Sequence, residues 1–176
     1  MLRPTFRNEN AEYGEARNAS TSREAAARPL EQLLYWLLRV ALGLYLVAAG
    51  TGKALDVPGY IAVIESFRLG LPAVLLWPSA IAIVVVELGL GFAILAGSVR
   101  AALGSAVLHG LYFALLASAL WRGLDVPNCG CFGVFFARPL GWDSLVEDLV
   151  LIALSLALGR LGQRHATRKQ AARATP

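Results

Sequence analysis

The two cysteines of the chain, Cys129 and Cys131, stand one residue apart within the run Asp125–Gly133. Sulfurs this close in sequence meet the geometry of a disulfide only where the backbone bends sharply. Gly130 permits unusual backbone dihedrals, and Pro127 and Asn128 add turn propensity. The resulting small ring is strained, and strained or exposed disulfides are the labile, catalytic ones. The spacing therefore predicts a redox pair that exchanges disulfides with a partner.

A structural bridge and a metal site are the two competing interpretations of the cysteine pair. The bridge is the weaker one, because so small a loop constrains the unfolded chain little. A closed zinc site needs four ligands, and the chain offers two cysteines and two histidines, of which His109 lies in an apolar stretch and His165 in a basic tail. We therefore predict no metal, unless carboxylates or a second protein complete a site.

The elements that position the cysteines are apolar. Of the 176 residues, 57% are hydrophobic and 16% are charged, whereas soluble domains are about a quarter charged. A membrane span needs about 20 mostly apolar residues. Four stretches approach this length: residues 33–50, 73–95, 101–121 and, shortest, 145–158. The predicted fold is all-α, an integral membrane four-helix bundle.

Charge sets the predicted orientation. With four spans, eleven of the 16 Lys and Arg residues fall on the side of the two tails and four fall in the two loops opposite. Cytoplasmic segments carry the excess of basic residues. We therefore expect a multi-pass protein of the cell (inner) membrane with both termini cytoplasmic. The Cys-Gly-Cys loop then lies outside, in an oxidising compartment.

Three regions follow from this pattern. Residues 1–29 form a polar tail whose composition cannot bury a core, so we expect it to be disordered. Residues 30–159 form the transmembrane domain, and residues 160–176 a basic cytoplasmic tail. The basic tails favour anionic lipid rather than nucleic acid. In the first outer loop, Asp56 and Pro58 predict the start of a short interfacial helix.

Ionisable side chains within spans usually face the bundle interior or a partner. Arg39, Glu87 and His109 fall at one predicted depth, which gives an intramembrane polar layer with an Arg39–Glu87 ion pair and His109 nearby. The layer fixes helix register or, alternatively, serves as a proton relay or lines a quinone or substrate cavity. Lys53, predicted just past the outer end of the first span, either snorkels or tunes a cysteine pKa.

The stretch from about Leu33 to Leu158 resembles the MauE/DoxX group of small bacterial membrane proteins, in particular the methylamine-utilisation MauE type. The residues that carry the resemblance are Arg39, Gly50, Lys53, Pro78, Glu87, the run Cys129–Gly133, and Gly141 with Trp142. The resemblance implies a DoxX-like four-helix bundle and a role in periplasmic disulfide chemistry. It also implies an association with maturation of the disulfide-rich small subunit of methylamine dehydrogenase. The acidic Glu147-Asp148 start of the last span departs from the pattern.

These observations lead to a thiol–disulfide oxidoreductase component of the membrane. Its partners would be a periplasmic thioredoxin-like or disulfide-rich client protein and the lipid bilayer, with no nucleic acid. Electrons would pass to a membrane quinone, and no other cofactor is implied. The alternatives are a small solute or ion carrier that uses Arg39, Glu87 and His109, and a non-catalytic membrane assembly factor.

Overall fold

The structure, a computed structural model, describes residues 9–133 and 135–174. It contains five helices: α1 (Glu9–Leu55), α2 (Val57–Ser66), α3 (Ala73–Leu95), α4 (Val99–Trp121) and α5 (Trp142–Ala174). No strand occurs in these two ranges. The all-α prediction is therefore confirmed, as is the short helix in the loop after the first span.

The chain divides into two compact units, residues 1–36 and residues 37–176. The first contributes the start of α1, in which Tyr35 and Trp36 pack edge to face with their ring centroids 5.9 Å apart. Residues 1–8 of the predicted polar tail lie outside the described residues, and residues 9–29 belong to α1. Everything that concerns the cysteines lies in the second unit.

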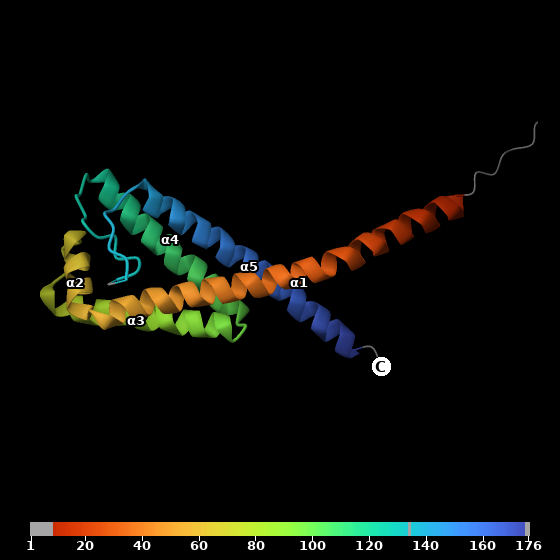
Figure 1. Cartoon of the computed structure of the whole chain (residues 1–176), viewed down its shortest axis with the longest axis horizontal. Helices are drawn as coiled ribbons and strands as arrows, with labels where there is room; N and C mark the ends of the chain where they lie inside the picture. The colour runs from red at the N-terminus through yellow and green to blue at the C-terminus, as the bar shows by residue number, and fades with distance from the viewer. Residues whose placement is uncertain (1–8, 134, 175–176) are drawn as a thin grey trace, which may run out of the picture. The chain divides into compact units, whose positions relative to one another are not determined.

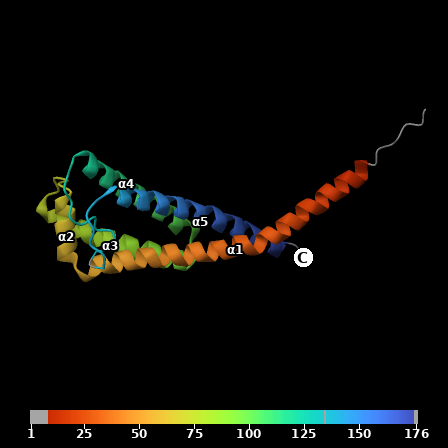
Figure 2. The same ribbon diagram turned by 45° about the horizontal axis from the view of Figure 1, so that its top comes forward.

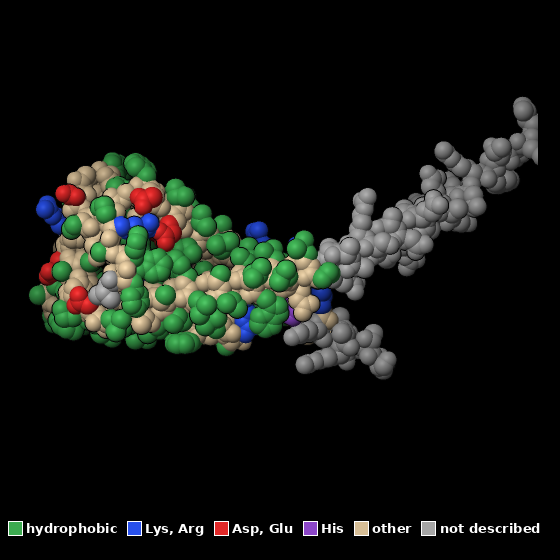
Figure 3. Space-filling model, in the orientation of Figure 1, with side chains coloured by type: hydrophobic (Ala, Val, Ile, Leu, Met, Phe, Trp, Pro, Cys, Tyr) green, Lys and Arg blue, Asp and Glu red, His purple; other side chains and the backbone are tan. Residues whose placement is uncertain are grey.

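Within the described residues, three helices are long and apolar enough to cross a membrane: residues 29–55 of α1, all of α3 and all of α4. Their outward faces are apolar, since Val74, Val85, Val107 and Leu111 all expose more than half of their side chains. Figure 3 shows hydrophobic side chains covering the sides of the helical body, with Asp and Glu gathered towards the end where α2 lies. Large exposed apolar surfaces mark contact with lipid or protein.

The fourth predicted span lies within α5, which is not among these three helices in the described part of the chain. The apolar stretch of α5 is bounded by Asp148 and Arg160 and covers only residues 149–159. A stretch of about 10 to 14 apolar residues is shorter than a typical span. The charges at both of its boundaries therefore set α5 apart from α1, α3 and α4.

Glycines allow α1 and α3 to approach closely. A Cβ atom on Gly91 would lie 3.0 Å from both the Gly43 carbonyl oxygen and the Val47 nitrogen, and one on Gly50 would meet Leu88. Small residues at such crossings let membrane helices pack backbone to backbone. The second half of α1 accordingly runs beside α3, while α4 runs beside α5 in both views (Figures 1 and 2).

Helix α2 closes one end of the second unit. The Asp56 carboxylate accepts a hydrogen bond from the Gly59 N–H at 2.8 Å, as an N-cap does, and Pro58 follows in the first turn. Tyr60 and Ile64 pack against the start of α3, and Phe67 packs against α4 and the loop that follows it. This helix therefore forms part of the buried core as well as the end of the unit.

We predict that Gly91→Ala lowers the stability of the purified protein in detergent, whereas Gly89→Ala does not. A Cβ atom on Gly91 meets the backbone of α1, while one on Gly89 meets no atom within 4 Å. Overpacking of this kind costs about 1–3 kcal/mol. Thermal unfolding monitored by circular dichroism measures the difference. Equal melting temperatures for the two variants would contradict the packing of α1 on α3.

Candidate functional site

The Cys-Gly-Cys turn is built by local hydrogen bonds in the 122–141 loop. The Asn128 side-chain oxygen accepts from the Gly130 N–H at 2.9 Å, and Gly130 has a φ of +77°. The Cys129 N–H donates to the Arg138 carbonyl oxygen at 2.8 Å. An asparagine bonded to the backbone two residues on is a standard turn device, and a positive φ favours glycine. The backbone therefore turns sharply at the residues predicted to form the redox pair.

Glycines allow the loop to pack closely against α1 and α2. A Cβ atom on Gly133 would overlap the backbone of Gly52, and one on Gly52 would overlap the carbonyl oxygen of Phe132. A Cβ atom on Gly130 would lie 2.8 Å from the Val63 side chain. Because the loop backbone lies directly on the last turn of α1, the positions of the two sulfurs depend on this contact.

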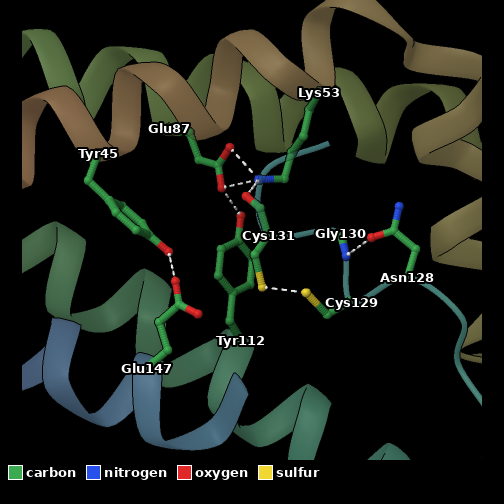
Figure 4. A network of polar contacts seen from close by, with 9 residues as sticks. All are labelled: Tyr45, Lys53, Glu87, Tyr112, Asn128, Cys129, Gly130, Cys131 and Glu147. Atoms are coloured by element: carbon green, nitrogen blue, oxygen red, sulfur yellow. Dashed lines mark hydrogen bonds and ion pairs between the residues drawn. The ribbon is translucent and has the colours of Figure 1, made fainter. Parts of the chain in front are cut away.

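A buried ion pair lies under the loop. Lys53 Nζ donates to Glu87 Oε1 at 2.8 Å, to Glu87 Oε2 at 2.9 Å and to the Cys131 carbonyl oxygen at 2.8 Å. The Tyr112 hydroxyl donates to Glu87 Oε1 at 2.7 Å. Lys53 is 2% exposed and Glu87 is 1% exposed. Figure 4 shows that the Lys53 ammonium group joins α1 to α3 and the loop, and that Tyr112 of α4 joins the network through the Glu87 carboxylate.

The position of Lys53 differs from the prediction. It lies within α1, which continues to Leu55, and not beyond the end of a span. Leu42, Leu46 and Ala49 are buried on α1, and Lys53 follows at the same three- and four-residue spacing. The side chain therefore points into the core, where it cannot snorkel to the surface.

The predicted Arg39–Glu87 ion pair is wrong, because Glu87 pairs with Lys53 instead. Arg39 Nε donates to the carbonyl oxygens of Ile94 and Leu95 at 3.1 and 3.0 Å. Leu95 is eight residues from Glu87, which is roughly 12 Å along a helix. Arg39 thus satisfies carbonyl groups that the end of α3 leaves without helical partners. The three ionisable residues do not form one layer.

His109 lies closer to the predicted site. Its Nδ1 is 2.8 Å from the Ser105 carbonyl oxygen, and its ring centroid is 6.1 Å from those of Tyr45 and Tyr112. The side chain is 2% exposed and lines the same cavity as Glu87. The structure therefore brings together Lys53, Glu87, His109 and both cysteines, and leaves Arg39 apart.

The two cysteine sulfurs are 2.9 Å apart and are not joined. This is about 0.9 Å beyond the length of a disulfide bond. The hydrogen bond between the two sulfurs lowers the pKa of Cys129 to about 5, with further contributions from the Cys131 backbone and the Arg138 guanidinium and against the opposing effect of burial. The same hydrogen bond, followed by burial and the charge of Cys129, raises the pKa of Cys131. The surroundings of the pair therefore favour the thiolate at Cys129 over the thiolate at Cys131.

Arg138 is a functional residue that the sequence analysis did not single out. It faces Cys129 and pairs with Glu147 and, at 3.3 Å, with Asp143 at the start of α5. Glu147 also accepts from the Tyr45 hydroxyl at 2.8 Å. The acids of α5 therefore hold Arg138 beside the Cys129 sulfur and link the loop to α1. An arginine nine residues after a cysteine in a loop carries no recognisable spacing, so only the fold reveals the contact.

A cavity of about 130 Å³ lies between the helices and the loop. Apolar side chains of α2, α3 and α4 form much of its wall. Its polar lining comprises Tyr45, Lys53, Tyr60, Ser79, Glu87, His109, Tyr112, Cys129, Cys131 and Asp148. Among the described residues, no group of three or more His, Cys, Asp or Glu side chains is arranged to hold a metal ion.

This arrangement defines a helical membrane protein with a pair of thiols at one end, beside a buried ion pair. Residues 31–161 match the family described as "Methylamine utilisation protein MauE". A curated relative, the "Methylamine utilization protein MauE" of Paracoccus denitrificans, is 33% identical over 131 residues, which cover 73% of this chain and 70% of the relative. No solved structure gives a significant match. The chain belongs to the MauE family.

We predict that Lys53→Met destabilises the protein by about 3–5 kcal/mol, because it leaves the Glu87 carboxylate unpaired in the interior. The double variant Lys53→Met/Glu87→Gln recovers part of that loss, since neither charge is then buried. Arg100→Met, at an exposed position, serves as the control and changes stability by less than about 0.5 kcal/mol. Thermal unfolding in detergent measures all three. A double variant less stable than Lys53→Met would argue against a mutual pair.

We predict that alkylation of Cys129 by iodoacetamide in the reduced protein is half-maximal near pH 5. The reactive thiolate forms above this pH and is lost as the pH falls through it. Cys131→Ala and Arg138→Gln raise the midpoint, because each removes a group that stabilises the thiolate, while Arg138→Lys keeps the charge. Mass spectrometry gives the rates, with the denatured protein as the reference. A midpoint near 8.5, the ordinary value, would contradict the stabilised thiolate.

Proposed function

We propose that this protein is a membrane thiol–disulfide oxidoreductase component that introduces disulfides into a secreted client. The observation that carries the proposal is the position of the pair: the two free sulfurs lie 2.9 Å apart and line one cavity. The hydrogen bond between them and the Arg138 guanidinium lower the pKa of Cys129, while the pKa of Cys131 is raised, which makes the pair asymmetric. A low thiol pKa stabilises the reduced form of a dithiol and so makes its disulfide a stronger oxidant. The pair is thereby poised to accept electrons from a client.

The asymmetry also assigns roles to the two sulfurs. Cys129 is 7% exposed, whereas Cys131 is partly exposed. A client thiolate attacks Cys131, the Cys129–Cys131 bond breaks, and Cys129 leaves as the lower-pKa thiolate. The second client thiolate then attacks the client sulfur of the mixed disulfide and releases Cys131. The client loses two electrons and forms a disulfide, and the protein gains both electrons.

Reoxidation requires a two-electron acceptor. A quinone in the bilayer takes two electrons from the reduced pair and two protons from water while the Cys131 thiol loses its proton, which restores the disulfide and yields the hydroquinone. The cavity beside Cys131 is close in size to the roughly 150 Å³ apolar cavity known to hold one benzene ring. The size and apolar walls of the cavity would fit the ring of a quinone. They therefore support a quinone as the electron carrier in the membrane.

The proposal includes an arrangement in the membrane. Residues 30–159 form a DoxX-like four-helix bundle of α1, α3, α4 and α5, with the loop at 122–141 outside the inner membrane and both termini, including the tails 1–29 and 160–176, in the cytoplasm. The basic residues of the C-terminal part of α5 support this orientation. So do Trp77, Trp121 and Trp142, which are exposed near helix ends on the loop side, as interfacial tryptophans are.

The client is a disulfide-rich or thioredoxin-like secreted protein. The name of the curated relative ties that protein to methylamine utilisation, and we extend this role to the present chain. Maturation of a secreted enzyme of methylamine metabolism is the process in which a disulfide donor of this kind would act.

The sidedness and redox state of the pair test the proposal in cells. A membrane-impermeant maleimide added to intact cells should modify Cys131 only after treatment with a reductant. The variant Cys129→Ser/Cys131→Ser gives the background. Labelling that needs permeabilised cells would place the loop in the cytosol. Labelling without reductant would indicate free thiols at steady state. Either result would leave the carrier or assembly roles as the alternatives.

The exchange reaction itself is measured with purified protein. The oxidised chain in detergent, mixed with a reduced peptide that carries two cysteines, should yield the peptide disulfide. In the reverse direction, Cys129→Ala mixed with the disulfide form of the peptide should accumulate a mixed disulfide at Cys131, because the Cys131 thiolate attacks the peptide disulfide and no Cys129 thiolate is present to displace the peptide. Cys131→Ala should accumulate much less, since Cys129 is buried. Equal accumulation in the two variants would contradict the assigned roles.

A further inference from the structure

Asp148 is a buried carboxyl group with one unsatisfied oxygen. The side chain is 5% exposed, and Oδ2 lies in the interior with no hydrogen-bond partner in the described part of the chain. A buried carboxylate oxygen without a partner is costly, and such groups in native structures call for an explanation. Asp148 lines the cavity that also contains Cys129 and Cys131.

The reaction at the cysteines leaves one proton without a carrier. Cys129 leaves as a stabilised thiolate and needs no proton. Cys131, beside that thiolate, has a raised pKa, so it must take up a proton when the client disulfide forms and lose it when the pair is reoxidised. Lys53 Nζ already donates all three of its hydrogen bonds, and Glu87 accepts from Lys53 and Tyr112. Neither member of the ion pair is free to carry this proton.

We propose that Asp148 donates a proton to the Cys131 thiolate when Cys131 is released and takes it back when Cys131 attacks. The inference rests on the proposed function. A cavity of about 130 Å³ has room for several water molecules of about 30 Å³ each, so the proton crosses the cavity directly or along water. The ionisable groups that line this cavity with Asp148 are Tyr45 and Lys53 of α1, Tyr60 of α2, Glu87 of α3, His109 and Tyr112 of α4, and the two cysteines; Arg138 of the loop also acts on Asp148 electrostatically.

The proton balance of the exchange is then complete. The Cys129–Cys131 bond breaks under attack on Cys131, and the mixed disulfide forms without a proton being needed. The second client thiolate breaks the mixed disulfide, and Cys131 leaves with the proton of Asp148. On reoxidation, the Asp148 carboxylate takes the Cys131 proton and keeps it for the next turnover. The two thiolates form the new bond and give two electrons to the quinone, which takes its two protons from water.

The two steps separate this role from a structural one. The oxidised full-length chain in detergent reacts with a reduced two-cysteine peptide, and acid quenching with mass spectrometry follows the rise and decay of the mixed disulfide at pH 7. In Asp148→Asn the rise keeps the wild-type rate, and the decay slows by tenfold or more, towards the lower range of general acid catalysis. Asp125→Asn, which removes an exposed carboxylate from the same loop, changes neither step.

Rescue experiments guard against misfolding. Asp148→Glu retains fast decay, and added formate speeds the decay in Asp148→Ala but not in the wild type. An unchanged decay in Asp148→Asn overturns the inference while the proposed function stands. Loss of both steps without formate rescue overturns it too, as a purely structural role would. If the wild type forms no mixed disulfide at all, the proposed function itself fails.

Discussion

The Lys53–Glu87 ion pair is the interaction on which the rest of the structure depends. Burying two opposite charges is favourable only when every donor and acceptor is satisfied. The third Lys53 hydrogen bond goes to the Cys131 carbonyl oxygen and the second Glu87 Oε1 bond comes from Tyr112. The loop therefore completes the solvation of the ammonium group, and the ammonium group fixes the loop. The same hydrogen bonds therefore stabilise the buried ion pair and fix the positions of the two sulfurs.

Much of the helical content was predictable from the sequence, because an apolar run long enough to span a membrane satisfies its backbone hydrogen bonds by forming a helix. The α3 and α4 spans agree closely with their apolar stretches. Asp56 and Pro58 correctly indicate the start of α2. The continuation of α1 to Leu55 was missed, since Gly50, Thr51 and Gly52 look like an end. In the structure, Gly50 and Gly52 are small because α3 and the loop approach α1 at those positions.

The site was predictable only in part, because the sequence gives residue types and not helix register. The pairing of Glu87 was assigned by counting depths from assumed cytoplasmic ends of the spans, and this count placed Arg39 level with Glu87, whereas Arg39 lies beside the end of α3. Continuing the spacing of Leu42, Leu46 and Ala49 to Lys53 gives the correct partner. Arg138 and Asp148 had no such signal, since their contacts with the cysteines depend on how a loop folds back over α5.

The acids at the start of α5 illustrate how a site distorts a hydropathy pattern. Asp143 and Glu147 pair with Arg138, Glu147 also binds Tyr45, and Asp148 faces the cavity. These are the same charges that keep α5 below the apolar length of the other three helices. Glu147 is partly buried and Asp148 is buried, whereas the Asp143 carboxylate is exposed. The acids that bring α5 into the candidate site therefore also shorten its apolar stretch.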